Sequence, residues 1–130
     1  MRKNNVTSKK RILIVEDEMP IRVMMNQFFS AQGYESALVS DAEQALEFLK
    51  KETPDLVITD VMFPGMDGWE LCKAIKGNPR TKSVPVIVLT GKATALEVMA
   101  YESGADSYLS KPFSNDELIR IVQGFLYKKQ

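Results

Sequence analysis

Side chains that could do chemistry follow four apolar runs in this sequence. The first run is followed by Glu16, Asp17 and Glu18, and the third by Asp60. The fourth run leads to Thr90, and the fifth, which ends at Ser110, is followed by Lys111. Each one alone is more often a solvated turn, a helix start or a cap, and their shared placement at the ends of runs favours a site. Two carboxylates ~4 Å apart repel by roughly 4 kcal/mol at an effective dielectric constant of about 20. A cluster of Asp60 with the first acids therefore needs a proton, a cation or a basic side chain.

The residue types indicate a hard cation and a phosphoryl group. The chain has no histidine, and no cysteine stands near these acids, so oxygen ligands favour Mg²⁺ or Mn²⁺ over Zn²⁺. Asp60, held between that cation and the Lys111 ammonium, could attack phosphorus and form an aspartyl phosphate. The two positive charges would neutralise the phosphoryl oxygens, and the Thr90 hydroxyl would hydrogen-bond one of them. We therefore expect a phospho-acceptor site.

Five apolar runs alternate with five helical patterns. The expected strands are 11–15, 34–39, 54–59, 84–90 and 106–110, and the expected helices are 21–33, 40–51, 69–77, 93–104 and 114–127. This alternation predicts an α/β fold, a doubly wound parallel sheet with helices on both faces. The first, third and fourth runs are continuously apolar and suit central strands, while the mixed second and fifth runs suit edges. Ligands bind at the carboxyl ends of such strands, where the polar residues stand.

Other residues have structural interpretations. Ser40 or Asp41 could cap the second helix, and Ser40 with Glu43 fits the capping-box spacing. The methionines read as core or loop filler, and Cys72 as an unreactive core thiol. The last helix carries a wide apolar arc, which fits either a broad buried face or a surface shared with a partner. The members of this arc are Leu118, Ile119, Ile121, Val122, Phe125 and Leu126.

Composition excludes several classes of protein. The 130 residues balance 17 basic against 17 acidic side chains, which argues against direct binding to nucleic acid or to an anionic membrane. No segment approaches the ~20 apolar residues of a membrane span. A single cysteine, Cys72, suits a reducing cytoplasm. We expect a polar tail at 1–10, one domain at 11–127 and a short C-terminal tail at 128–130.

Four motifs together give the chain a family resemblance. The segments "LIVEDE", "DLVITDVMFPGMDGWEL", "PVIVLTGKA" and "GADSYLSKPF" resemble the receiver domain of two-component response regulators over nearly the whole length. The resemblance implies a five-stranded flavodoxin-like fold with strand order 2-1-3-4-5. It also implies that Asp60 accepts phosphate from a phosphohistidine, carried by a sensor histidine kinase or a histidine phosphotransfer protein.

The resemblance also assigns roles at the site. It implies that Glu16 and Asp17 help to bind Mg²⁺ together with Asp60 and the backbone carbonyl of Met62. Glu16 stands where Asp is commoner, which leaves open whether it touches the metal directly or through water. Thr90 and Lys111 match the switch hydroxyl and the lysine of the family. Tyr108 matches the aromatic residue whose rotamer follows the switch hydroxyl, and a cis peptide is expected at Lys111–Pro112.

These roles lead to an expectation about function. Phosphorylation would reshape the surface made by the fourth helix, the fifth strand and the fifth helix, and an unknown downstream protein would recognise it. The chain would act as a monomer or a phosphorylation-dependent homodimer, without turning over an external substrate. Because it ends after the fifth helix, we expect a stand-alone regulator. The alternatives are a degenerate receiver used only for binding and a receiver piece of a larger regulator or hybrid kinase.

Three other families of similar topology or chemistry fit poorly. A flavodoxin-like FMN carrier needs a Ser/Thr/Gly-rich phosphate loop where this chain has "EDEMP". A phosphatase of the haloacid dehalogenase type would usually carry a second Asp at position 62, which is Met62. A P-loop around Gly91–Lys92 would need a glycine in place of Val86 and Ser or Thr in place of Ala93.

Overall fold

The computed structural model describes residues 9–61, 65–90 and 103–127. Its sheet has five parallel strands in the order β2-β1-β3-β4-β5, as expected from the sequence. The strands are β1 (Arg11–Val15), β2 (Glu35–Val39), β3 (Leu56–Asp60), β4 (Val86–Thr90) and β5 (Ser107–Ser110). The helices are α1 (Met19–Ala31), α2 (Ala42–Lys51), α3 (Gly68–Lys76) and α5 (Asn115–Leu126). Most of the predicted helix 93–104 lies outside the described residues.

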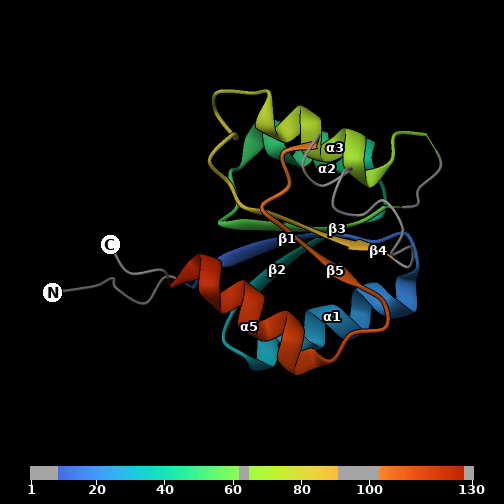
Figure 1. The fold of residues 1–130 in the computed structure, drawn as a ribbon, viewed down its shortest axis with the longest axis vertical. Coiled ribbons are helices and arrows are strands. Elements are labelled where there is room, and N and C mark those ends of the chain that lie inside the picture. The colour runs from blue at the N-terminus through green and yellow to red at the C-terminus, as the bar shows by residue number, and fades with distance from the viewer. Residues whose placement is uncertain (1–8, 62–64, 91–102, 128–130) are drawn as a thin grey trace, which may run out of the picture.

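Helices cover both faces of the sheet, with α1 and α5 on one face and α2 and α3 on the other (Figure 1). Successive residues of β1 alternate between the two cores: Ile12 packs toward α1 and α5, and Leu13 packs toward α2 and α3. β3 and β4 alternate in the same way. Because both faces of the three central strands are buried, their sequences are continuously apolar. The edge strands β2 and β5 are only partly buried, which confirms their prediction as edges.

The helix ends follow from local hydrogen bonds. The Asp41 carboxylate caps α2 by accepting the Gln44 backbone N–H at 2.8 Å. The Ser40 backbone N–H donates to the Gln44 side chain, so the capping box expected between Ser40 and Glu43 is wrong. Capping boxes do start α3, between Asp67 and Glu70, and α5, between Ser114 and Glu117. α1 is followed by Gly33 at φ 93°, the helix stop that a glycine allows.

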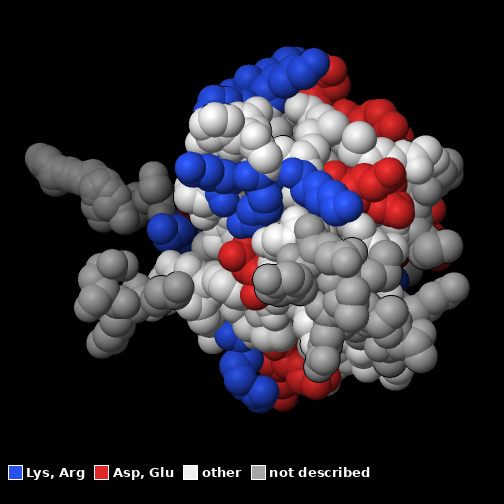
Figure 2. Space-filling model, turned by 45° about the horizontal axis from the view of Figure 1, so that its top comes forward, with Lys and Arg blue, Asp and Glu red and all other residues white. Residues whose placement is uncertain are grey.

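Charge is arranged along α2 and α3 as the helix dipole favours. Each helix has a glutamate in its first turn and two lysines in its last turn. On the upper part of the face in Figure 2, most blue side chains accordingly lie to the left and most red ones to the right. The first turns lie toward the carboxyl ends of the strands, so the acidic side of this face adjoins the predicted site.

The apolar side chains settle two open interpretations. All six members of the apolar arc on α5 pack in or against the core between α5 and the sheet, which supports the broad buried face. Met25 is buried, but Met19 and Met24 are 63% and 59% exposed, so they are not core filler. Together with Val23 they give α1 an exposed apolar surface. Within the described residues, no helix is long and apolar enough to span a bilayer.

Candidate functional site

Asp60 is the last residue of β3, and both of its carboxylate oxygens are engaged. Oδ2 accepts a hydrogen bond from the Lys111 ammonium at 3.0 Å, and Oδ1 accepts the Val61 backbone N–H at 2.8 Å. The Asp60 side chain is 12% exposed, and that of Lys111 is 35% exposed. A carboxylate held on one side by an ammonium and open in part to solvent is suited to attack an electrophile brought from outside.

Three carboxylates gather directly after β1. Oxygens of Glu16, Asp17 and Glu18 lie within 4.8 Å of one another, and within the described residues they form the one group of three or more potential metal ligands that lie so close together. Glu16 is 2% exposed, while Asp17 and Glu18 face solvent. The sequence predicted a metal-binding role for Glu16 and Asp17 but not for Glu18. Glu18 is the N-cap residue of α1, its carboxylate makes no capping hydrogen bond, and it lies close to the carboxylates of Glu16 and Asp17.

Backbone and side-chain contacts hold this acidic segment in place. The Glu18 N–H donates to the Glu16 carboxylate at 3.2 Å. Arg22, one turn into α1, donates from its guanidinium to the Glu16 backbone carbonyl at 2.7 Å. The Glu16 N–H in turn donates to the carbonyl of Val39 on β2 at 3.0 Å. Glu16 is therefore fixed by β2 and α1 together, which the sequence around it did not indicate.

The Glu16 carboxyl has an unusual affinity for its proton. Burial raises its pKa from 4.5 to about 7, against the lowering effect of the Glu18 N–H. The negative charge of Asp60 raises this pKa further, and the Lys111 ammonium lowers it. Asp60 is not among the three gathered carboxylates, but its charge therefore acts on the buried one, Glu16. Because burial is the largest cause, the raised pKa reflects the loss of hydration of the Glu16 carboxylate more than repulsion between carboxylates.

Thr90 and Tyr108 come from the next two strands. Thr90 ends β4, is 5% exposed, and pairs in register with Ser110. Its backbone carbonyl accepts the Lys111 N–H at 2.8 Å, which attaches the end of β5 to the end of β4. Tyr108 lies opposite Val88 and packs against the core under α2 and α3. The predicted metal ligand Met62 lies outside the described residues. The Lys111–Pro112 peptide is cis, as expected.

The donor set fits a hard divalent cation. All of the side chains gathered after β1 offer carboxylate oxygens, and a bound cation would favour the ionised form of Glu16, whose pKa burial raises. Oxygen ligands of this kind suit Mg²⁺ or Mn²⁺. The fit rests on the carboxylates themselves, and Glu16 and Asp17, two of the predicted ligands, are among them.

An apolar pocket borders the site and was not foreseen. Its volume is about 300 Å³, and Glu16 and Lys111 form part of its wall. Met24 and Phe28 of α1 and Leu118 of α5 contribute much of its apolar lining. Met24 and Met25 both line this pocket, but only Met25 is buried. Successive side chains of a helix point about 100° apart, so the sequence already indicated that one of the two methionines would lie outside the core.

Comparisons with known proteins give a consistent result. The family model described as "Response regulator receiver domain" matches residues 12–123. The DNA-binding response regulator MtrA of Mycolicibacterium smegmatis is 34% identical over 125 residues, which cover 95% of this chain and 54% of that protein. This chain spans about half the length of the curated relatives it matches.

Solved structures agree with the sequence comparisons. A putative response regulator from Chloroflexus aurantiacus is 34% identical, with a TM-score of 0.87 over 93% of this chain and 100% of that one. The response regulator protein TrrA from Thermotoga maritima, solved in complex with Mg(2+)-BeF, is 33% identical. Its TM-score is 0.82 over 90% of this chain and 99% of that one.

Proposed function

This chain belongs to the family of response regulator receiver domains, and on that premise we propose that it is a phosphorylation-dependent signalling switch whose phospho-acceptor is Asp60. The observation that carries the proposal is the 3.0 Å contact between the Lys111 ammonium and the Asp60 carboxylate, beside the acidic group after β1. A nucleophile, a fixed positive charge and oxygen ligands for a cation thus lie together at the carboxyl ends of the strands.

The proposed reaction transfers a phosphoryl group from a phosphohistidine. An Asp60 carboxylate oxygen attacks phosphorus in line, a new P–O bond forms, and the P–N bond to the imidazole breaks with its electron pair left on nitrogen. The Lys111 ammonium moves no proton in this step. It stays close to the transferred oxygens and stabilises the negative charge that they carry. The reaction acts on the chain itself, so the protein is a switch rather than an enzyme with turnover.

A divalent cation completes the proposed site. Glu16 and Asp17 would hold Mg²⁺, or Mn²⁺, together with Asp60 and the Met62 carbonyl. Bound there, the cation supplies positive charge that neutralises the phosphoryl oxygens. Glu16 must give up its proton before it can act as a ligand, since a protonated carboxyl binds a hard cation poorly. TrrA, solved with Mg(2+)-BeF, supports this choice of cation by similarity.

The switch would act through Thr90 and Tyr108. With a phosphoryl group on Asp60, the Thr90 hydroxyl would turn toward it, and Tyr108 would follow from the neighbouring strand. Phosphate would thereby bias an equilibrium between two existing states. The surface of the fourth helix, β5 and α5 would carry the signal, although most of the fourth helix lies outside the described residues.

Partners follow from the same premise. A sensor histidine kinase or histidine phosphotransfer protein would supply the phosphoryl group, and a downstream protein would read the altered surface. The exposed apolar side chains of α1 lie beside the site, where a phosphodonor protein that delivers a phosphoryl group to Asp60 could pack against them. MtrA is called DNA-binding but is about twice as long, so a receiver piece of a larger regulator remains the alternative to a stand-alone one.

Trp69 offers a direct optical test. It is 5% exposed and lies in α3, directly after Gly68, whose N–H donates to the Val61 carbonyl at 2.8 Å. We expect its fluorescence to change on addition of Mg²⁺ and again on addition of beryllofluoride. Asp60→Asn should lose the second change. Asp116→Asn, an exposed first-turn acid of α5, is the matched control and should keep both.

The same titrations separate the proposal from a degenerate binding module. If beryllofluoride leaves Trp69 fluorescence unchanged in the parent protein, or if Asp60→Asn responds like the parent, the phospho-acceptor assignment is wrong. The chain would then use its receiver fold only for binding.

A further inference from the structure

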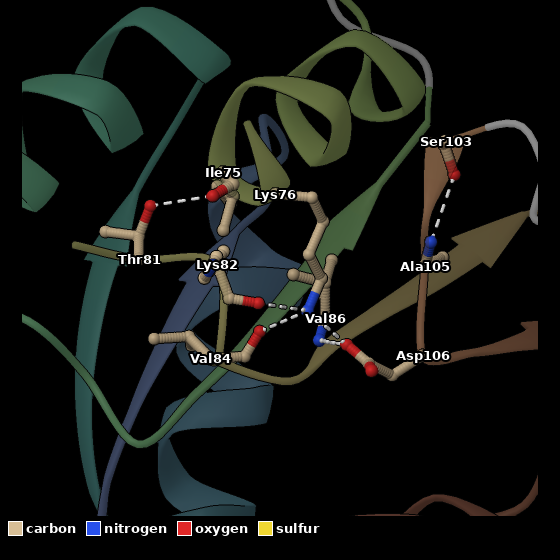
Figure 3. Close-up of polar contacts among 9 residues, drawn as sticks. All are labelled: Ile75, Lys76, Thr81, Lys82, Val84, Val86, Ser103, Ala105 and Asp106. Carbon is tan, nitrogen blue, oxygen red and sulfur yellow. Dashed lines mark hydrogen bonds and ion pairs between the residues drawn. The ribbon is translucent and has the colours of Figure 1, made fainter. Parts of the chain in front are cut away.

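A second polar network lies at the opposite end of the sheet from Asp60 and centres on the ammonium of Lys76 (Figure 3). This ammonium is 2.7 Å from the Asp106 carboxylate and donates to the Val84 carbonyl at 2.7 Å and the Lys82 carbonyl at 3.2 Å. The Lys76 side chain is only 19% exposed. Three oxygens from two separate segments therefore hold the last residue of α3.

Asp106 is fixed by more than its ion pair. Its carboxylate also accepts the Val86 N–H at 2.8 Å, and its own N–H donates to the Val86 carbonyl at 2.9 Å. Asp106 directly precedes β5, and Val86 is the first residue of β4. The beginning of β5 is thus attached both to β4 and, through Lys76, to α3.

The neighbouring residues reinforce this attachment. Gly104, at φ 83°, approaches Lys76 so closely that a Cβ there would lie 3.2 Å from the Lys76 Cγ. Burial raises the pKa of the Cys72 thiol of α3, and the Ser103 side chain lowers it by less, so the two side chains lie near each other. The Ser103 hydroxyl also accepts the Ala105 N–H at 3.3 Å. The described segment that leads into β5 therefore lies on α3 over several residues.

The other end of α3 is attached to the phospho-acceptor. The Gly68 N–H donates to the Val61 carbonyl, and a Cβ on Gly68 would lie 2.1 Å from the Asp60 carbonyl oxygen. α3 therefore begins in contact with the Asp60 backbone and ends at Lys76. One short helix connects the carboxyl end of β3 to the start of β5.

β5 has few attachments of its own within the sheet. It has four residues, lies at the edge of the sheet, and pairs only with β4. Directly after it comes Lys111, whose ammonium must reach Asp60 across the end of β4. A small displacement of an edge strand moves the residue that follows it, so the position of Lys111 depends on how firmly β5 is held.

We propose that Lys76 is a positioning residue for the phospho-acceptor site. By holding Asp106 against α3 and β4 it fixes β5, and by fixing β5 it keeps the Lys111 ammonium beside Asp60. The inference rests on the proposed function, because it concerns the efficiency of phosphorylation at Asp60. It goes beyond that function by assigning a role to a residue at the far end of the sheet.

The chain provides a matched control on the same helix. Lys73 stands one turn before Lys76 and is exposed. Within the described residues, its side chain makes no hydrogen bond or ion pair, whereas the Lys76 side chain makes three such contacts. Lys73→Met removes an ammonium from α3 without touching Asp106. Lys76→Arg keeps the positive charge but replaces the ammonium with a guanidinium. Asp106→Asn removes the negative charge that pairs with Lys76.

Two measurements test the inference on the full chain. The first is the rate of phosphorylation by acetyl phosphate with Mg²⁺, and the second is amide hydrogen exchange without a phosphodonor. We expect Lys76→Met to slow phosphorylation about tenfold, below the hundredfold that ~1 Å of misplacement can cost. Exchange at residues 107–111 should rise about tenfold or more, while the amides of β1 and β3 keep their protection.

The variants make the outcome decisive. Asp106→Asn should match Lys76→Met, the double variant should be no slower than either, and Lys76→Arg should recover part of the rate. Lys73→Met should behave like the parent. A Lys76→Met protein that is phosphorylated at the parental rate, or whose exchange rises equally in all strands, overturns the positioning role. A parent protein that accepts no phosphoryl group instead contradicts the proposed function itself.

Discussion

Lys111 and Asp60 are 51 residues apart in sequence, and the ammonium of one lies 3.0 Å from the carboxylate of the other. Asp60 ends β3 and Lys111 follows β5, and these strands are not neighbours, because β4 lies between them. The contact therefore depends on the register of three strands. At the carboxyl end of β5, the Lys111 N–H donates to the Thr90 carbonyl. At the other end, Asp106 is hydrogen-bonded to Val86, and together these contacts hold the register of β5.

Removal of the Lys111 ammonium should slow phosphorylation strongly. Lys111→Met takes away the fixed positive charge beside Asp60, and loss of one such electrostatic contact typically costs about 10²- to 10³-fold in rate. The rate of phosphorylation by acetyl phosphate measures the effect. Lys51→Met, an exposed lysine in the last turn of α2, is the control and should react like the parent. Equal rates for the two variants would remove Lys111 from the mechanism.

Glu16 should make the metal-free protein less stable as the pH rises. Its folded pKa, about 7, lies above its ordinary value of 4.5, so the folded chain retains a proton that the unfolded chain has released. The free energy of unfolding should therefore fall between about pH 4.5 and 7, by on the order of 3 kcal/mol at most. Urea unfolding with EDTA measures it. Glu16→Gln should lack this part of the pH dependence, and parallel profiles for both proteins would refute the assignment.

The same proton should compete with Mg²⁺. Because Glu16 must ionise before it can bind a cation, the affinity for Mg²⁺ should drop as the pH falls below about 7, by up to about tenfold per pH unit. Trp69 fluorescence at pH 6 and pH 8 reports the affinity. Glu16→Gln should bind weakly at both values, whereas Asp116→Asn should keep the parental dependence. A parental affinity that does not vary with pH would exclude Glu16 as a ligand.

Gly68 should tolerate no side chain. A Cβ there would lie 2.1 Å from the Asp60 carbonyl oxygen and 2.9 Å from the Val61 Cα, so the backbone next to the phospho-acceptor would have to move. Gly68→Ala should cost about 1–3 kcal/mol of stability and slow phosphorylation. Gly124→Ala, on α5 with no atom within 4 Å of its Cβ, should instead stabilise the protein by up to about 1 kcal/mol. Thermal unfolding compares them, and equal melting temperatures would contradict this account.

Most of the fold could be predicted from the sequence, because the three central strands are buried on both faces and are therefore continuously apolar. Ile12, Leu13 and their counterparts in β3 and β4 form runs that only central parallel strands explain. The helix caps were less predictable, since Ser40 and Asp41 are both good caps. In the structure Asp41 is the cap, because its carboxylate accepts the Gln44 N–H, and the Gln44 side chain, rather than that of Glu43, accepts the Ser40 N–H.

The site was predictable where strand ends determine it. Asp60 and Thr90 end their strands, and Lys111 follows directly after Ser110, as the apolar runs indicated. The inclusion of Glu18 and the contact of Arg22 with the Glu16 carbonyl depend on how α1 leaves β1, which no residue pattern encodes. The Lys76–Asp106 pair joins residues 30 positions apart, from different elements, and needed the tertiary structure.

The central claim, that Asp60 is the phospho-acceptor, is tested most directly by identifying the phosphorylated residue. The full chain is incubated with acetyl phosphate and Mg²⁺, its intact mass is measured, and the label is challenged with hydroxylamine. The account predicts the gain of one phosphoryl group that hydroxylamine removes, its loss in Asp60→Asn, and its retention in Asp116→Asn. An Asp60→Asn protein that still gains a hydroxylamine-sensitive phosphoryl group would contradict the account.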